Sequence, residues 1–151
     1  MPAGSEPVTL PRTWRPLGPR IAAPAFALIL VAAFAALWLR FDESTKDSVN
    51  VLQKLTIFAI VGLAMALLFA MARSRVEATT EGLVVVNGYR RRTIEWAEVG
   101  TVRVPQGAPW PHLDLGDDER VSLMGIHTSD GRRAEIAVRE LRAVVADHRV
   151  D

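Results

Sequence analysis

The sequence predicts a membrane-anchored α+β protein, in which a hairpin of two transmembrane helices precedes a small antiparallel β domain closed by a C-terminal α-helix. Three observations predict this class. The first half holds two long apolar runs without a charged residue, the second half holds short β-branched segments separated by turn residues, and an amphipathic stripe follows near the end. At 151 residues, half of them apolar, the chain is too short for two large domains.

Residues 1–20 predict a disordered tail, because they hold five of the nine prolines and few large hydrophobic residues. Trp14 beside Arg15 is the exception. An aromatic ring next to arginine just outside a span suits the lipid headgroup layer, and an incidental Trp in a tail is the alternative.

Residues 21–39 predict the first transmembrane helix, with Trp38 near its far end and Pro24 in its first turn, where the missing N–H costs least. A cleaved signal peptide is the alternative, because Ala33-Phe34-Ala35 resembles a cleavage site. The apolar run continues past that site, which favours a membrane span.

Residues 55–72 predict the second span, which at about 1.5 Å per residue covers most of a ~30 Å hydrocarbon core. The connector, residues 40–54, is short and carries three charges of each sign, so the spans form an antiparallel hairpin. Arginines flank the hairpin's two ends at positions 12, 15, 20, 73 and 75. The positive-inside rule therefore predicts a multi-pass protein of the plasma membrane, with both termini cytoplasmic and the connector extracytoplasmic.

Small residues recur four apart in both spans, and the simplest prediction is that these faces let the two helices pack together. They are Ala32 and Ala36 in the first span and Gly62, Ala66 and Ala70 in the second. Neither span contains an ionisable residue, which argues against a transporter or channel.

From residue 75 onward the pattern predicts six short strands, at 76–80, 83–86, 91–96, 99–104, 113–115 and 121–124. Asn87-Gly88 predicts a tight β-hairpin, because both residues tolerate positive φ. The last element is a helix with Ser129 or Asp130 as its N-cap and one apolar stripe, made of Ala134, Ala137, Val138, Leu141, Val144 and Val145. We expect the stripe to cover a core made of Leu83, Val85, Ile94, Trp96, Val102, Leu113, Leu115, Val121 and Leu123.

The segments Glu81-Gly82-Leu83-Val84-Val85-Val86-Asn87-Gly88 and Ile94-Glu95-Trp96-Ala97-Glu98-Val99, with Val102 and the Leu141 helix behind them, resemble the bacterial pleckstrin-homology (PH) domain membrane proteins. In these proteins two transmembrane helices precede a PH-like module. The resemblance implies a cytoplasmic PH-like barrel or sandwich at residues 75–149, in a bacterial plasma membrane. PH proteins that grip phosphoinositides use the first strand hairpin. Here that turn is expected at Thr80-Glu81-Gly82, which is short and acidic, so a specific inositol-phosphate pocket is not expected.

Two sets of residues are candidate contact sites. Anionic lipid is the candidate ligand of Arg73, Arg75, Arg90, Arg91 and Arg92, the last three forming a basic run expected in a hairpin loop. A protein partner is the candidate ligand of Trp110, which lies between two prolines, and of Ile136, which falls outside the apolar stripe. Each site has an alternative interpretation. In it, the basic run is a solvated loop, Trp110 is a side chain folded back onto the domain, and Ile136 is an ordinary exposed hydrophobic residue.

Other chemistry is not expected. The chain has no cysteine, and Asp114, Asp117, Asp118 and Glu119 lack the spacing of a calcium loop. His112, His127 and His148 are far apart in sequence, and no catalytic motif or cofactor-binding motif is present. The net charge of +1 gives no reason to expect nucleic acid.

The function that this pattern predicts is a non-enzymatic scaffold or adaptor that binds an unidentified protein partner at the inner face of the membrane. Two alternatives stay open. One is an anionic-lipid-sensing module, and the other is an auxiliary subunit whose hairpin packs into a larger membrane complex.

Overall fold

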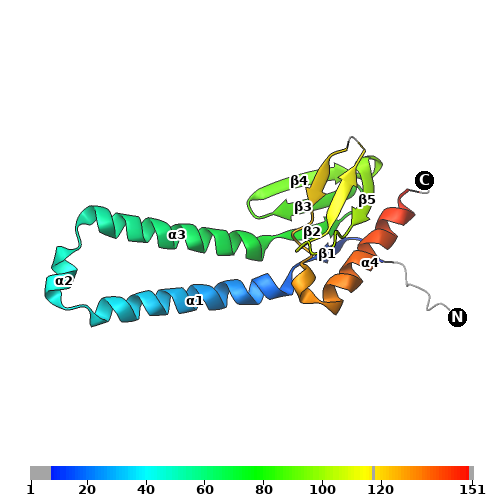
Figure 1. Ribbon diagram of the computed structural model, residues 1–151. Helices are drawn as coiled ribbons and strands as arrows, with labels where there is room; N and C mark the ends of the chain where they lie inside the picture. The colour runs from blue at the N-terminus through cyan, green and yellow to red at the C-terminus, as the bar shows by residue number, and fades with distance from the viewer. Residues whose placement is uncertain (1–7, 117, 150–151) are drawn as a thin grey trace.

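The computed structural model describes residues 8–116 and 118–149. Its most extended feature is a hairpin of two antiparallel helices, α1 (Leu17–Arg40) and α3 (Val51–Arg73), joined by the short helix α2 (Glu43–Ser48). This helical hairpin projects away from a compact β domain (Figure 1). Both long helices are apolar enough to cross a membrane, and almost none of either is buried within the protein.

Each long helix begins four residues before the predicted apolar run. At α3 the cause is a capping box, in which the Asn50 side chain accepts from the Gln53 N–H and the Gln53 side chain accepts from the Asn50 N–H, both at 2.9 Å. This box satisfies orphan N–H groups of the first turn, so the helix begins in polar sequence.

Toward their far ends, the two long helices meet through aromatic side chains. Phe34 lies between Trp38 and Phe58, with ring centroids 6.3 and 6.4 Å away. Ala32, Ala36 and Gly62 are exposed, and Gly62 has open space where a Cβ would lie. The prediction that these faces pack against each other is therefore wrong for Ala32, Ala36 and Gly62, whereas Ala66 and Ala70 are half-buried.

The β domain is a sandwich of two antiparallel sheets with one covering helix. The first sheet has the order β1 (Arg12–Trp14), β2 (Arg75–Ala78), β3 (Gly82–Asn87), β4 (Arg90–Glu95). The second has the order β5 (Val99–Arg103), β6 (His112–Leu115), β7 (Arg120–Ser122). Short 3₁₀ helices, η1 (Trp96–Glu98) and η2 (Thr128–Asp130), precede β5 and the final helix α4 (Arg132–Asp147). The sheets do not close into a barrel.

Strand β1 corrects the prediction of a disordered tail for residues 8–20, while residues 1–7 lie outside the described residues. Trp14 pairs with Val76 and is 6% exposed, so it lies in the domain core and not among lipid headgroups. The strand was hidden because it is only three residues long and its partner follows the whole helical hairpin.

This pairing makes the helical hairpin an insertion between two adjacent strands. The chain leaves the sheet after β1, runs out along α1, returns along α3 and re-enters the sheet at β2 (Figure 1). The helical hairpin is thus the connection between the first and second strands. The prediction that Thr80-Glu81-Gly82 forms that connection is wrong, because this turn joins the second and third strands.

The predicted core is confirmed with one exception. Eight of its nine residues are buried, and Trp96 is only half-buried because it begins η1 instead of ending a strand. Its Nε1 donates to the Thr79 carbonyl at 3.1 Å, and its ring stacks on His148 at 4.0 Å. The α4 stripe is also confirmed, with Ala134, Val138, Leu141, Val144 and Val145 buried and Ala137 packed against the core.

The predicted N-cap of α4 is wrong. Gly131, with φ +55°, occupies that position and provides no side chain, and both Ser129 and Asp130 belong to η2. A left-handed φ at this position favours glycine. The Asp130 carboxylate is thereby released for a different helix.

Candidate functional site

The junction between domain and helical hairpin is held by the start of α1. Asp130 of η2 accepts hydrogen bonds from the Leu17 N–H at 2.7 Å and the Gly18 N–H at 2.8 Å. A carboxylate at this position satisfies two orphan donors and opposes the positive end of the helix dipole. A residue of the β domain therefore caps the helix that leaves it.

A second contact holds the end of α3. The β3–β4 turn is Gly88-Tyr89, one residue later than the predicted Asn87-Gly88, because Asn87 is the last residue of β3 and pairs with Arg90. The Tyr89 hydroxyl donates to the Ala66 carbonyl at 2.7 Å. The Arg73 guanidinium lies 5.5 Å from the Tyr89 ring centroid and 5.7 Å from that of Phe69. The tip of the β3–β4 hairpin thus rests on the last turns of α3 (Figure 1).

Ser74 reinforces the same contact from the link between α3 and β2. Its hydroxyl donates to the Ala70 carbonyl at 3.1 Å and accepts from the Gly88 N–H at 3.0 Å. A Cβ on Gly88 would lie 3.2 Å from the Ala70 Cβ, and its φ is +61°. Both the space and the backbone conformation therefore favour glycine here.

The five arginines predicted to contact lipid fall into three settings: Arg73 lies over two aromatic rings, Arg75 is in β2, and the other three are in β4. Arg90, Arg91 and Arg92 lie in strand β4 and not in a loop, and all three are exposed. Arg75 pairs with Glu77 at 3.7 Å, and Arg92 pairs with Glu119 across the two sheets, with Arg92 Nη2 2.8 Å from Glu119 Oε2. Among residues 8–116 and 118–149, Arg90 and Arg91 form no ion pair.

The Arg92–Glu119 pair stabilises the charged form of both partners. Its hydrogen bonds hold the pKa of the Glu119 carboxyl below its usual range, and the same contact raises the pKa of Arg92. Both side chains are exposed to solvent, so the pair is a modest link between the sheets.

A groove of about 620 Å³ lies beside this pair, between β3 and β4 on one side and β7 on the other. We call it the arginine groove. Its rim carries Arg90, Arg91, Arg92 and Arg120, and its floor includes Val85, Val121 and Met124. Asn87 ties the sheets together at one end, donating to the Ser122 carbonyl at 2.6 Å and accepting from the Met124 N–H at 3.1 Å.

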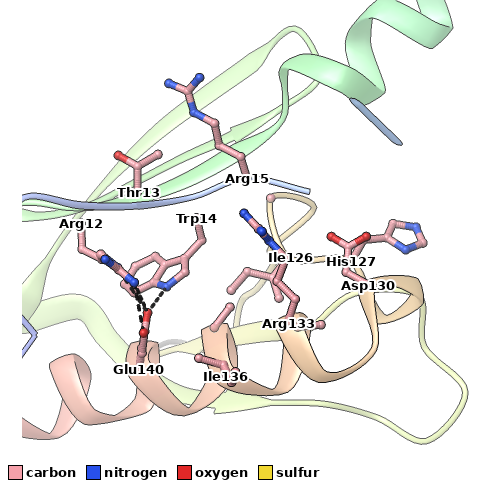
Figure 2. A pocket seen from close by; sticks show the side chains of 13 residues that line it. Arg12, Thr13, Trp14, Arg15, Ile126, His127, Asp130, Arg133, Ile136 and Glu140 are labelled. Carbon is pink, nitrogen blue, oxygen red and sulfur yellow. Dashed lines mark hydrogen bonds and ion pairs between the residues drawn. The ribbon is translucent and has the colours of Figure 1, made fainter. Parts of the chain in front are cut away.

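A smaller cleft of about 270 Å³ separates β1 from α4. Glu140 accepts from Trp14 Nε1 at 2.9 Å and from Arg12 Nη2 at 3.0 Å. Figure 2 shows Arg12 and Trp14 directed from β1 toward α4, with Thr13 and Arg15 on the other side of the strand. Glu140 and Asp130, the two acids that line this cleft, hold β1 and the start of α1 in place, so both have a structural role.

The two predicted partner-contact residues lie apart. Ile136 is 40% exposed at the rim of the β1–α4 cleft. Trp110 is half-buried, and its ring meets His127 edge-on at 6.1 Å. Thr128 secures the loop from its backbone N–H, which donates to the Pro109 carbonyl at 2.9 Å.

Two acids at the β6–β7 turn, Asp114 and Glu119, pair with arginines. Asp114 is 2.6 Å from Arg103 and 3.3 Å from Arg120, and Glu119 is committed to Arg92. Asp117 lies outside the described residues. Within the described part of the chain, no group of three His, Cys, Asp or Glu side chains is placed to hold a metal ion.

Sequence reasoning missed four residues that organise this region: Asn87, Tyr89, Asp130 and Glu140. Asn87 and Asp130 were interpreted from local signals, as a turn residue and a cap, but their side chains bond to distant backbone. Tyr89 is the sole tyrosine of the chain and directly follows Asn87-Gly88. Its place after this turn signal indicates that it lies at a hairpin tip.

Comparison with known proteins agrees with this architecture. The family model described as Bacterial PH domain matches residues 73–143. Uncharacterised proteins of Mycobacterium tuberculosis and Mycobacterium bovis are each 33% identical over 147 residues, which cover 95% of this chain and 92% of the relative. No solved structure matches. The alignment with the mycobacterial relatives includes the helical hairpin as well as the sandwich, and the chain belongs to the bacterial PH domain family.

Proposed function

We propose that this protein is a non-enzymatic scaffold or adaptor, anchored in the bacterial plasma membrane by α1 and α3, whose PH-like domain binds a protein partner at the cytoplasmic face. The long exposed hydrophobic residues of both helices support membrane insertion, because an apolar surface of this extent is costly in water. The basic residues Arg12, Arg15, Arg20, Arg73 and Arg75 gather at the domain end of the hairpin, which supports a cytoplasmic domain.

The observation that carries the proposal is the insertion of the helical hairpin between β1 and β2. Two chain crossings, the Asp130 cap and the Tyr89 contact hold the domain in one orientation relative to the helices. A domain on a flexible tether samples many orientations, whereas this one presents the same faces at a fixed height above the bilayer. Fixed presentation is what a docking platform needs.

Cysteine labelling and photo-cross-linking in native bacterial membranes test the proposal. The chain has no cysteine, so Thr45→Cys and Glu95→Cys report the two sides without background. We expect an impermeant maleimide to label Thr45→Cys from outside and Glu95→Cys only after lysis. The reverse pattern would contradict the orientation.

The partner is sought with a photoreactive phenylalanine analogue at Ile136, and at Thr45 as the control. We expect a discrete protein adduct from position 136 and none from position 45. The same result should hold at Arg139, on an exposed turn of α4. If no position on the domain gives a protein adduct, the adaptor role is contradicted.

The exposed small residues favour a second candidate, an auxiliary subunit of a larger membrane complex. Ala32, Ala36 and Gly62 face away from the partner helix, and such residues allow close approach of a foreign helix in lipid. Replacing Gly62 and Ala36 with Leu should then abolish co-purification with that complex, while Leu28→Ala as a control should not.

A further inference from the structure

The free edge of strand β5 is only partly engaged within the protein. In the part of the chain that the structure describes, β5 has β6 as its one strand neighbour, and helix α4 packs against β5 (Figure 1). The Val102 carbonyl is directed toward α4, because it accepts from Arg142 Nε at 3.1 Å. A flexible and exposed side chain thus occupies a position at which a further strand would donate its N–H.

A groove of about 480 Å³ runs beside this edge, between α4 and the end of β5. We call it the β5–α4 groove. Val104, Ala134 and Val138 give it an apolar lining, and Val104 is 41% exposed although it is aliphatic. Its α4 side extends from Gly131 to Arg142, which at about 1.5 Å per residue is about 16 Å, the length of about five residues of extended peptide.

The main-chain pairing that this edge offers is short. A register irregularity between Val99 and Val102 interrupts the β5–β6 ladder, and Pro105, which has no N–H, follows Val104. The backbone of residues 102–104 is therefore the part of the edge that an added strand can use. Side-chain contacts with α4 must supply the selectivity.

The charges beside the groove favour an acidic occupant. Arg139 and Arg142 line its α4 side, and Glu135 lines it nearer the start of the helix. Both arginines are exposed, and neither forms an ion pair within residues 8–116 and 118–149. Arg139 follows Val138 of the apolar lining. A ligand with a carboxylate near an aliphatic side chain would therefore meet a cation that the protein itself leaves without a counter-charge.

The direction of an added strand follows from the placement of β5 and α4. Both pairs in this sheet are antiparallel, and antiparallel pairing is the more stable per residue. Strand β5 runs from Val102, beside Arg142, toward Val104. A strand antiparallel to β5 therefore runs toward the arginines, and its acidic residues follow its apolar residues in sequence.

We infer that the β5–α4 groove binds an extended acidic peptide segment of a protein partner, which adds to the edge of β5. A peptide N–H donates to the Val102 carbonyl in place of the Arg142 side chain. An aliphatic side chain of the peptide lies on Val104 and Val138, and a carboxylate of the peptide pairs with Arg139. This inference rests on the proposed adaptor role, because it names the class of protein segment that the domain binds.

Fluorescence anisotropy of labelled octapeptides, titrated with the full chain in mild detergent, tests the inference. The acidic probe is STVTVDED, and the basic probe STVTVKKK has the opposite charge. Arg139→Glu reverses a charge in the groove, and the matched control Arg133→Glu reverses an exposed charge on the side of α4 that lines the β1–α4 cleft. We expect Arg139→Glu to bind the acidic probe at least about fivefold more weakly than the wild type does and the basic probe more tightly, and the control to behave as the wild type.

N-methylation of the acidic probe tests the main-chain pairing. Every second residue of an added strand directs its N–H to the edge that it joins. One version of the probe is N-methylated at its threonines and the other at its valines. We expect one version to lose binding and the other to keep it.

Three outcomes would overturn the inference: no binding of the acidic probe to the wild type at millimolar concentration, equal loss in Arg139→Glu and Arg133→Glu, or equal binding of the two N-methylated probes. Self-association of the chain that Arg139→Glu abolishes, without probe binding, would overturn it in favour of a second copy as the occupant. The probes need no membrane and no native partner. Probe binding without a cross-linked protein in native membranes would therefore contradict the adaptor role alone, whereas a cross-linked protein without probe binding would overturn the peptide site alone.

Discussion

Glu140 holds β1 against α4. It accepts hydrogen bonds from both Arg12 and Trp14, and Trp14 is buried. Glu140→Gln weakens the bond from the Arg12 guanidinium and offers the Trp14 N–H a poorer acceptor. We expect the free energy of unfolding to fall by about 1–3 kcal/mol, as for other hydrogen bonds to charged groups.

Chemical unfolding of the full chain in detergent, followed by circular dichroism, measures this change. Glu135→Gln on the exposed face of the same helix is the control and should change stability by less than ~0.5 kcal/mol. Equal effects of the two substitutions would show that Glu140 does not hold β1.

Glu119 makes the contact between the sheets sensitive to acid. The hydrogen bonds from Arg92 lower its pKa. The folded state therefore stabilises the ionised carboxylate relative to the unfolded chain. The contribution of the pair is therefore complete above the unfolded-state pKa and is lost as the pH falls through the lower, folded-state pKa.

Carbon-detected NMR titration of the Glu119 carboxyl in the full chain should give a midpoint below that of an unhindered glutamate. Arg92→Gln should return the midpoint toward the ordinary range. An unchanged midpoint in that variant would mean that Arg92 does not cause the shift.

At the scale of the elements, α1 depends on a cap that its own sequence does not supply. Pro16 precedes the helix and offers no side-chain hydrogen bond, and Asp130 of η2 takes that role. Asp130→Ala leaves the Leu17 and Gly18 N–H groups without this acceptor, and the loss of a cap costs about 0.5–2 kcal/mol.

Hydrogen exchange locates this effect. We expect faster exchange at the Leu17 and Gly18 amides in Asp130→Ala, with the far end of α1 near Arg40 unchanged. Asp130→Asn keeps an acceptor oxygen and should exchange at an intermediate rate. Unchanged exchange in Asp130→Ala would refute the cap.

At the scale of the whole molecule, the sandwich needs the segment before the helical hairpin as well as the segment after it. Trp14 fills the core beside Val76, and Val8 and Leu10 pack against that core. A fragment beginning at Ser74 lacks this strand and exposes the edge of β2, a position prone to aggregation. We expect it to be less stable than a chain in which residues 17–73 are replaced by a short glycine-rich turn joining β1 to β2.

Thermal unfolding and two-dimensional NMR of the two soluble proteins make the comparison. The joined chain should show dispersed amide signals and the higher midpoint. If the fragment from Ser74 is equally stable, β1 is dispensable and the hairpin is an appendage of the domain rather than an insertion in it.

Local periodicity in the sequence encodes the regular elements of this fold. Two charge-free runs predicted the two long helices. Alternation and the Asn87-Gly88 signal predicted strands β2 to β7. The stripe from Ala134 to Val145 predicted α4 and its buried face. The predicted core is nearly complete for the same reason, since burial follows the period of each element.

Which distant segments meet depends on the folded arrangement of the chain. Strand β1 is three residues long, and its hydrogen bonds come from a strand beyond the whole helical hairpin, so no local pattern marks it. Asp130 caps α1 and Asn87 bridges the sheets through hydrogen bonds between residues far apart in the chain. Arg90 and Arg120, also far apart in sequence, line the same groove. These contacts place the basic groove beside the end of α3, because a side chain's partner is set by the folded geometry and not by its neighbours in sequence.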